Sequence, residues 1–313
     1  MENHTGLAFT SDAIALSNFQ VKSGTRVLTN LDKIAYPFQY EENIFFLEDN
    51  IIRLANLLLN RLDSLHLEPS KISISLESNL SLIKKIEIPS GLDEKEEAKH
   101  IEWDLTNSLI SSIEEYLYLK TTNFYDKNTH KEVMVIALRK SIIDFFKSFV
   151  EFAKIKLNNI STNNLAAELC FQNSITNNKD NINLLFRINS DRIESLCLLE
   201  NKLYVSDYEK IKTVSTRSKE EILLEKITNY IKKTENHFEQ INNSTQKINN
   251  VYLYGMGIKE SFISLLSKNI STNILTLNPL DNINLAENLV ITEDDIDEKS
   301  GFVESIGITL DSD

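Results

Sequence analysis

Two short polar turns carry residue types that could hold a phosphate group. The stretch GLAFTSDAIALSNFQ, residues 6–20, predicts a strand, a turn and a second strand, and its turn holds Thr10, Ser11 and Asp12. A second stretch, LLFRINSDRIESLCLL at 184–199, repeats this pattern around Asn189. Backbone N–H groups at such turns can bind phosphate oxygens, and a nearby carboxylate can hold Mg²⁺ through water. These turns are therefore the first candidates for a phosphate site.

Other catalytic patterns are missing from the sequence. The histidines have no spacing that is typical of a zinc site: His4, His66, His100, His130 and His237. There is no P-loop, no G-x-G-x-x-G and no G-x-S-x-G motif. Glutamates 94, 96 and 97 fall in the first turn of a predicted helix, where they stabilise the helix dipole. The sequence therefore predicts no catalytic residue and no metal site.

Composition narrows the classes of partner. The net charge is −13, from 33 basic and 46 acidic residues, and no basic cluster is interleaved with aromatic residues. This argues against nucleic acid as a partner, because duplex binding begins with a positive face, and against direct docking on anionic lipid. Glycine occurs only seven times in 313 residues, which is too few for several phosphate-binding loops.

The cysteines and the apolar runs indicate a cytoplasmic chain. Cys170 and Cys197 each lie inside an apolar run, which is typical of reduced core thiols in a cytosolic protein. The first twenty residues lack the pattern of a signal peptide, and no apolar run approaches the ~20 residues that a membrane helix needs. We therefore expect no direct membrane insertion.

Hydrophobic patterns place the two turns in an α/β fold. Short strands are expected at 6–9, 13–21, 25–30 and 34–38, with a hairpin turn at Ser23-Gly24, and a helix then ends before Pro69. Residues 71 to about 156 follow the order β-β-α-β-β-α, which predicts an inserted α+β lobe between Pro69 and the polar stretch LNNISTNN, expected to be a loop. The closing GFVESIGITL predicts a short helix or strand.

Three segments follow from this order. Residues 1–70 form the N-terminal part of a first lobe, 71–156 form the inserted lobe, and 157–313 supply the rest of the first lobe and a second lobe. Because both halves begin with a hairpin whose turn contains Ser-Asp, we expect a duplicated fold, although polar hairpins are common and the match could arise by chance.

This order resembles the actin-like ATPase fold and, within it, the PilM family of type IV pilus assembly proteins, relatives of FtsA. The best single match is VMVIALRKSIIDFFKSFVEFA, residues 133–153, and IEIP at 86–89 also resembles the family. The adenosine-binding turn resembles VYLYGMG, with Gly255 and Gly257, and an Asn-Pro pair falls on LNPL, at 277–280. The resemblance implies an actin-like duplicated α/β fold with an inserted small α+β lobe.

The phosphate turns depart from the family. Its D-x-G turns fall on Ala8 to Thr10 and on Arg187 to Asn189, so both carboxylates and both glycines are replaced. Asp12 and Asp191 lie beyond these positions and are expected to cap turns. Hydrolysis of ATP on this fold needs carboxylates that hold Mg²⁺. We therefore expect a pseudo-ATPase without a cofactor, in which any ATP would rely on the degenerate turns.

The resemblance also implies a partner. In this family a groove near the inserted lobe binds the cytoplasmic tail of PilN, a single-pass inner-membrane protein, so we expect a non-catalytic scaffold, cytoplasmic and peripheral at the inner membrane. Trp103, the single tryptophan, is a candidate anchor for the tail; a role in the core or between lobes is the alternative. Two other functions stay open: an active ATPase or sugar kinase with shifted catalytic residues, and the cytoplasmic domain of a type II secretion platform protein.

Overall fold

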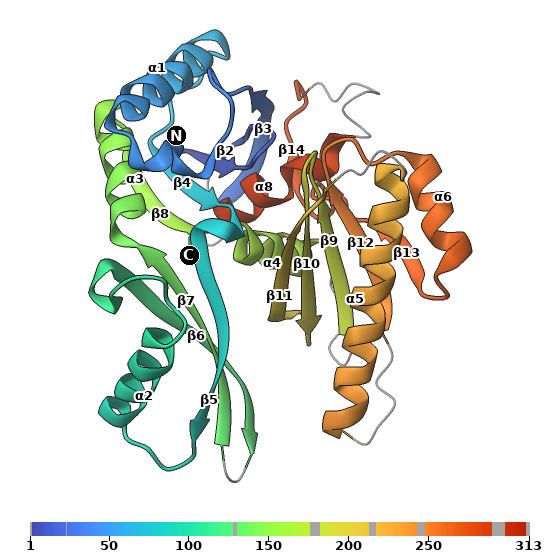
Figure 1. The fold of residues 1–313 in the computed structure, drawn as a ribbon. Helices are drawn as coiled ribbons and strands as arrows, with labels where there is room; N and C mark the ends of the chain where they lie inside the picture. The colour runs from blue at the N-terminus through green and yellow to red at the C-terminus, as the bar shows by residue number, and fades with distance from the viewer. Residues whose placement is uncertain are drawn as a thin grey trace.

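The chain folds into two large lobes and one smaller lobe (Figure 1). The structure is a computed structural model, and it describes residues 2–22, 24–127, 130–175, 182–212, 217–242, 248–289 and 298–310. In Figure 1 the first lobe lies at the upper left, the second at the right and the smaller lobe at the lower left. Ser23 of the predicted hairpin turn lies outside the described residues.

The first lobe is built on a six-stranded sheet in the order β14-β3-β2-β1-β4-β8. Its strands are β1 (Glu2–Phe9), β2 (Ile14–Lys22), β3 (Thr25–Ile34), β4 (Lys71–Leu76), β8 (Lys156–Thr162) and β14 (Asn284–Leu285). The 3-10 turn η1 (Glu42–Phe46) and the helices α1 (Glu48–Ser64) and α3 (Lys140–Phe152) pack on one face of this sheet. A group of edge-to-face phenylalanines, among them Phe9, Phe45 and Phe146, fills this part of the core.

The second lobe repeats the same plan. Its five-stranded sheet has the order β11-β10-β9-β12-β13, with β9 (Ile182–Ile188), β10 (Arg192–Leu199), β11 (Lys202–Lys210), β12 (Ile248–Gly255) and β13 (Asn273–Thr276). The helices α5 (Lys219–Asn242) and α6 (Glu260–Asn269) cover one face. In both sheets an antiparallel three-stranded meander is followed by two parallel strands. The expected duplication is therefore confirmed by the topology.

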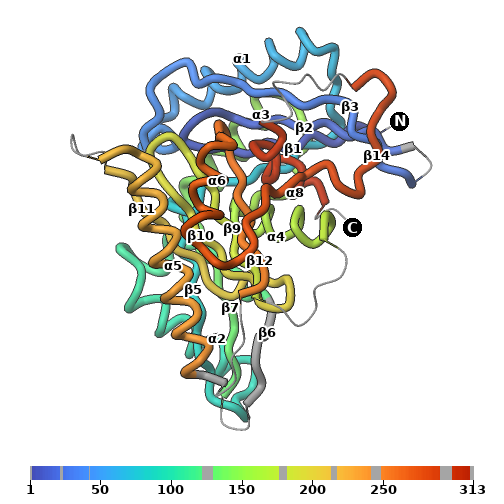
Figure 2. Tube along the Cα trace, turned by 90° about the vertical axis from the view of Figure 1, so that its right-hand side faces the viewer, coloured from blue at the N-terminus to red at the C-terminus, as the bar shows by residue number. Residues whose placement is uncertain are grey.

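Two helices lie between the sheets, α4 (Asn163–Ser174) and α8 (Val303–Leu310), near the centre of the molecule in Figures 1 and 2. One hydrophobic cluster joins them to the inner faces of both sheets. The helices touch closely because a Cβ atom at Gly307 would lie 1.8 Å from the carbonyl oxygen of Ala166. A Cβ atom at Gly6 on β1 would lie 2.0 Å from the carbonyl oxygen of Ser305. These glycines allow close packing of backbones.

The smaller lobe has a three-stranded sheet in the order β5-β7-β6 and one helix. Its elements are β5 (Ser81–Pro89), α2 (Glu94–Thr106), η3 (Ile113–Glu115), β6 (Tyr116–Lys127) and β7 (His130–Arg139), and η2 (Ser78–Leu80) leads into it. A capping box starts α2, because Asp93 accepts from the N–H of Glu96 and the Glu96 side chain accepts from the N–H of Asp93.

The boundaries of this inserted lobe differ from the predicted 71 and 156. The strand at 71–76 pairs with β1 in the main sheet, and α3 packs on α1, so the inserted lobe runs from Ser81 to Arg139. The predicted loop LNNISTNN contains most of β8, an edge strand paired with β4. An edge strand tolerates polar residues because one side of it is open to solvent, which hid the strand in the sequence.

Other predictions are largely confirmed. The strand expected at 25–30 is β3, which runs on to Ile34, but the separate strand expected at 34–38 is wrong because residues 35–38 are in no strand. The closing segment forms η4 (Lys299–Phe302) and α8. Cys170 and Cys197 are buried free thiols. Within the described ranges, no helix combines the length and the apolar character that crossing a membrane requires.

Candidate functional site

The two predicted phosphate turns face each other between the large lobes. One is the β1–β2 turn, residues 10–13, and the other is the β9–β10 turn, residues 189–191. In the first, the Thr10 hydroxyl donates to the Ala13 carbonyl at 2.7 Å and accepts from the Ala13 N–H at 3.1 Å. In the second, the Asn189 N–H donates to the Arg192 carbonyl at 3.0 Å. Both turns are therefore closed by their own residues.

The tips of the turns are also bonded to each other. The Asp12 carboxylate accepts from the N–H of Ser190 at 3.2 Å and from its hydroxyl. The Asn189 amide lies 3.4 Å from the Ser11 hydroxyl. Asp12 was expected to cap a turn, and it does so on the opposite lobe. Asp191, for which the same role was expected, pairs with Arg192 at 2.8 Å.

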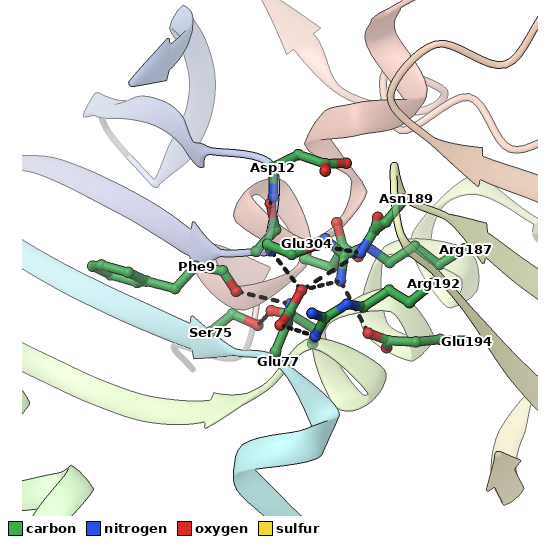
Figure 3. A network of polar contacts seen from close by, with 12 residues as sticks. Phe9, Asp12, Ser75, Glu77, Arg187, Asn189, Arg192, Glu194 and Glu304 are labelled. Carbon is green, nitrogen blue, oxygen red and sulfur yellow. Dashed lines mark hydrogen bonds and ion pairs between the residues drawn. The ribbon is translucent and has the colours of Figure 1, made fainter. Parts of the chain in front are cut away.

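Below the tips, a buried network of arginines and glutamates joins the lobes (Figure 3). Arg187 on β9 forms ion pairs with Glu304 of α8 at 2.8 Å and with Glu194 of β10 at 3.3 Å, and lies 4.0 Å from Glu77. Arg192 on β10 pairs with Glu77, which directly follows β4, at 2.8 Å. The side chains of Arg187, Arg192, Glu77, Glu194 and Glu304 are at most 4% exposed.

Glu77 is the centre of this network. Its carboxylate accepts from the Ser11 N–H at 2.5 Å and from the Tyr40 hydroxyl at 2.9 Å, besides Arg192. Close by, the Ser75 hydroxyl donates to Asn163 at 2.5 Å, and the Asn163 amide donates to the Phe9 carbonyl. The ends of β1 and β4 are thereby fixed to the start of α4.

Burial and charge set the protonation of the network. Burial raises the pKa of Glu77 to about 7, opposed by the nearby Arg187 guanidinium, and burial likewise raises the pKa of Glu304 to about 7. Burial alone would lower the pKa of Arg187, but Glu304, Glu194 and Glu77 raise it well above its usual value. Arg187 therefore stays charged and holds the glutamates around it.

This arrangement occupies the groups that a magnesium–phosphate complex would use. Ala8, in the family's carboxylate position, is fully buried in the core. The Ser11 and Ser190 N–H groups donate to the protein carboxylates Glu77 and Asp12. The carboxylates of the network are in turn paired with Arg187 and Arg192. The residues present do not fit a Mg²⁺–phosphate group in this conformation.

The predicted adenosine turn is packed by protein as well. The Gly255 carbonyl accepts from the Ser300 hydroxyl at 2.8 Å. Gly255 has φ +120°, and a Cβ atom there would lie 2.4 Å from the Ile188 carbonyl oxygen, so close contact between β12 and β9 explains this glycine. The Met256 side chain lies against Gly301. Gly257 is exposed with open space around its Cα, and Asn278 bonds with Asp281 in its own turn at 2.6 Å.

Trp103, the candidate anchor, lies on α2 and is 67% exposed. The alternative role in the core or between lobes is therefore wrong. A separate groove opens between the first lobe and the inserted lobe, with a volume of about 410 Å³, and Trp103 does not line it. The lining residues are Asn43, Phe46, Asn79, Leu80, Ser81, Leu82, Ser108, Leu109, Ile110, Tyr116, Arg139 and Ile142.

Sequence reasoning missed most of the network. Arg187 was recognised as a positive charge at the second turn, but Glu77, Arg192, Glu194 and Glu304 were not singled out. One signal was available: Glu304 interrupts the apolar run GFVESIGI, and a charge inside a buried segment needs a partner.

Comparison with known proteins identifies the fold. No family model and no curated protein sequence matches the chain. Among solved structures, a PilM–PilN type IV pilus biogenesis complex superposes with a TM-score of 0.77 at 15% identity, covering 98% of this chain and 97% of that one. The chain has the actin-like ATPase fold.

Two further structures share this actin-like fold. The cytoplasmic domain of EpsL, an inner-membrane component of the type II secretion system of Vibrio cholerae, has a TM-score of 0.52 at 8% identity, covering 99% of this chain and 94% of that one. A Bacteroides thetaiotaomicron protein described as having an actin-like ATPase fold and unknown function has a TM-score of 0.51 at 15% identity, covering 90% and 93%. The predicted fold class and the resemblance to PilM are confirmed.

Proposed function

We propose that this actin-like chain is a non-catalytic scaffold of a type IV pilus or related secretion machine. In this proposal it binds the short cytoplasmic tail of a PilN-like inner-membrane protein and lies at the cytoplasmic face of that membrane. The likeness to the PilM–PilN complex and to EpsL supports the class of machine. The observation that carries the non-catalytic part is the buried network between the two phosphate turns.

The network argues against turnover on energetic grounds. A phosphate entering between the turns would have to displace the carboxylates of Glu77 and Asp12 from the N–H groups of Ser11 and Ser190. A metal ion would have to take a glutamate from Arg187 or Arg192, leaving a buried guanidinium without its partner, which costs about 3–5 kcal/mol. Binding of a nucleotide in this cleft would therefore be only weakly favourable in free energy.

The groove beside the inserted lobe is the best place for a tail. Phe46 and Ile110 line it and expose 44% and 92% of their surface. Exposed apolar side chains beside a groove are typical of a peptide-binding site. A tail that places an apolar side chain between Phe46 and Ile110 would bury surface that otherwise faces water.

Arg139 gives this groove a polar contact. Its Nε donates to the Tyr116 hydroxyl at 3.0 Å, and its guanidinium lies 5.8 Å from the ring centres of Phe46 and Tyr116. These contacts of Arg139 are with aromatic residues and not with a carboxylate. Its remaining donors can therefore bond backbone carbonyls of an extended tail. Since the whole chain carries −13, a tail with Lys or Arg should still associate faster at low salt.

The binding test uses a synthetic peptide with the sequence of the cytoplasmic tail of a PilN-like protein from the same organism. We expect calorimetry to give a Kd on the order of micromolar, because the tail must be ordered on binding. Ile110→Asp should weaken binding by about tenfold or more, since it places a charge in the apolar contact. Ile52→Asp, at an exposed isoleucine of α1 outside the groove, is the matched control. Equal affinity in both variants would exclude this groove.

The catalytic part is tested separately with ATP. We expect no binding heat with ATP, with or without Mg²⁺, and no release of phosphate above a heat-inactivated sample. The competing proposal, an active ATPase or sugar kinase, requires tight ATP binding and magnesium-dependent turnover. Turnover that is lost on changing Asp12 to Asn would establish the enzyme instead.

A further inference from the structure

The sheet of the inserted lobe has two faces of different composition. On the face toward α2, β5 and β7 present Ile86, Ile88, Val133 and Val135. Because side chains alternate along a strand, the residues between them point to the other face. That second face carries the ionisable side chains Lys85, Glu87, His130 and Glu132.

Strand register brings three of these side chains together. Glu87 is directly opposite Glu132, and His130 is opposite Pro89, two positions along. One oxygen of each carboxylate and one ring nitrogen of His130 all lie within 4.8 Å of one another. Glu132 is buried, His130 is half-buried and Glu87 is exposed, so the cluster can be reached from solvent.

The two carboxylates of this cluster lie near one ammonium group, that of Lys85. Two carboxylates directly opposite each other on paired strands repel. Lys85 lies 3.2 Å from Glu132 and also donates to the hydroxyl of Tyr204, in the second lobe, at 2.6 Å. Among the described residues, the lysines of this lobe that form ion pairs do so with Asp104, Glu132 and Glu97, and none of them pairs with Glu87. One ammonium therefore faces two carboxylates beside an imidazole.

We propose that Glu87, His130 and Glu132 bind one divalent transition-metal ion of the Zn²⁺ class. Imidazole nitrogen and carboxylate oxygen both suit zinc, and three protein ligands leave a fourth position for water. The imidazole makes Mg²⁺ and Ca²⁺ poor candidates, since these ions prefer oxygen ligands. Sequence spacing predicted no metal site because these ligands are brought together by strand register, far apart along the chain.

Binding at this position has a structural consequence. The ion would tie β5 to β7 and would compete with Lys85 for the Glu132 carboxylate. Lys85 also lies 4.0 Å from the centre of the Tyr204 ring, and the Tyr204 hydroxyl is 3.2 Å from Nε2 of His237 on α5. Metal binding would therefore change the contact that Lys85 makes between the inserted lobe and the second lobe.

The test is a calorimetric titration of ZnCl₂ into the full chain, free of any tag and treated with a chelator. We expect one Zn²⁺ per chain, and affinity weakened about tenfold or more in Glu87→Gln and in His130→Asn. His66→Asn, at an exposed histidine of the first lobe, is the matched control and should bind as the parent does. Circular dichroism checks that each variant is folded, and MgCl₂ serves as the ion control.

A further variant tests whether Glu132 is a ligand of the proposed metal site. Lys85→Met removes the ammonium that competes for Glu132, so this variant should bind Zn²⁺ more tightly than the parent. Weaker or unchanged affinity in Lys85→Met contradicts the assignment of Glu132 as a ligand. Absence of Zn²⁺ binding, or binding that Glu87→Gln and His130→Asn leave unchanged, overturns the proposal as a whole.

Discussion

Replacing Arg187 tests whether the buried network holds the two lobes together. In Arg187→Met a side chain of similar length keeps the packing, but Glu304 and Glu194 lose ion pairs of 2.8 and 3.3 Å. Breaking a buried pair by removing one partner costs about 3–5 kcal/mol. Glu304 already has a pKa of about 7, so it can become neutral in the variant. We therefore expect the free energy of unfolding to decrease by about 3 kcal/mol, the lower end of this range.

This loss of unfolding free energy can be measured as a decrease in the melting temperature. With an unfolding entropy of about 2.1 cal/mol/K per residue, 313 residues give about 0.7 kcal/mol/K, so 3 kcal/mol corresponds to a decrease in Tm of about 4–5 °C. Differential scanning calorimetry at pH 7 measures it. The deficit should narrow at pH 5, because Glu304, whose pKa burial raises to about 7, is protonated there and no longer needs a charged partner.

Two further variants serve as a surface control and as a test of recovered stability. Arg61→Met removes a surface pair with Asp32, where the Arg61 side chain is 43% exposed, and should cost at most about 1 kcal/mol. The double variant Arg187→Met with Glu304→Leu should recover part of the lost stability, because an apolar pair replaces an unpaired charge. If Arg187→Met costs no more than Arg61→Met, the network does not stabilise the closed lobes.

Two other predictions concern pH and close packing. Because the folded pKa of Glu304 is raised to about 7, its contribution to stability is present below the unfolded value of 4.5 and is lost as the pH rises through 7. Urea unfolding should therefore show stability falling between pH 5 and 7.5, and the fall should be smaller in Glu304→Gln. If the parent and Glu304→Gln show the same dependence on pH, the raised pKa of Glu304 is contradicted. Gly307→Ala forces α8 away from Ala166 and should cost about 1–3 kcal/mol, measured by the same unfolding assay against Lys268→Ala, at an exposed position in the last turn of α6.

The sequence predicted local structure well because local patterns determine it. Alternating residues on both sides of the Ser-Asp turns identified the hairpins, and their repetition identified the duplicated fold. The acidic helix, with glutamates in its first turn, was equally visible. Where these patterns weaken, as in the polar edge strand β8, the prediction failed and the lobe boundary moved with it.

The candidate site could not be predicted because its partners are distant in sequence. Arg187 meets Glu77, which follows β4, and Glu304 from the last described helix, and neither glutamate lies in a recognisable motif. The sequence showed that the usual carboxylates were missing at Ala8 and Arg187. It did not show that other carboxylates fill the place between the turns, because charge pairing across lobes depends on the finished fold.

The central position of α8 has a consequence for synthesis on the ribosome. Ser305 accepts from the Ser17 hydroxyl at 2.7 Å across 288 residues, and α8 covers β1 and α4. Closing a loop of 288 residues costs roughly 5 kcal/mol of chain entropy, and proteins dominated by such distant contacts fold slowly. The first lobe therefore cannot complete its core until residues 303–310 have emerged, and its apolar inner face stays open to chaperones until then.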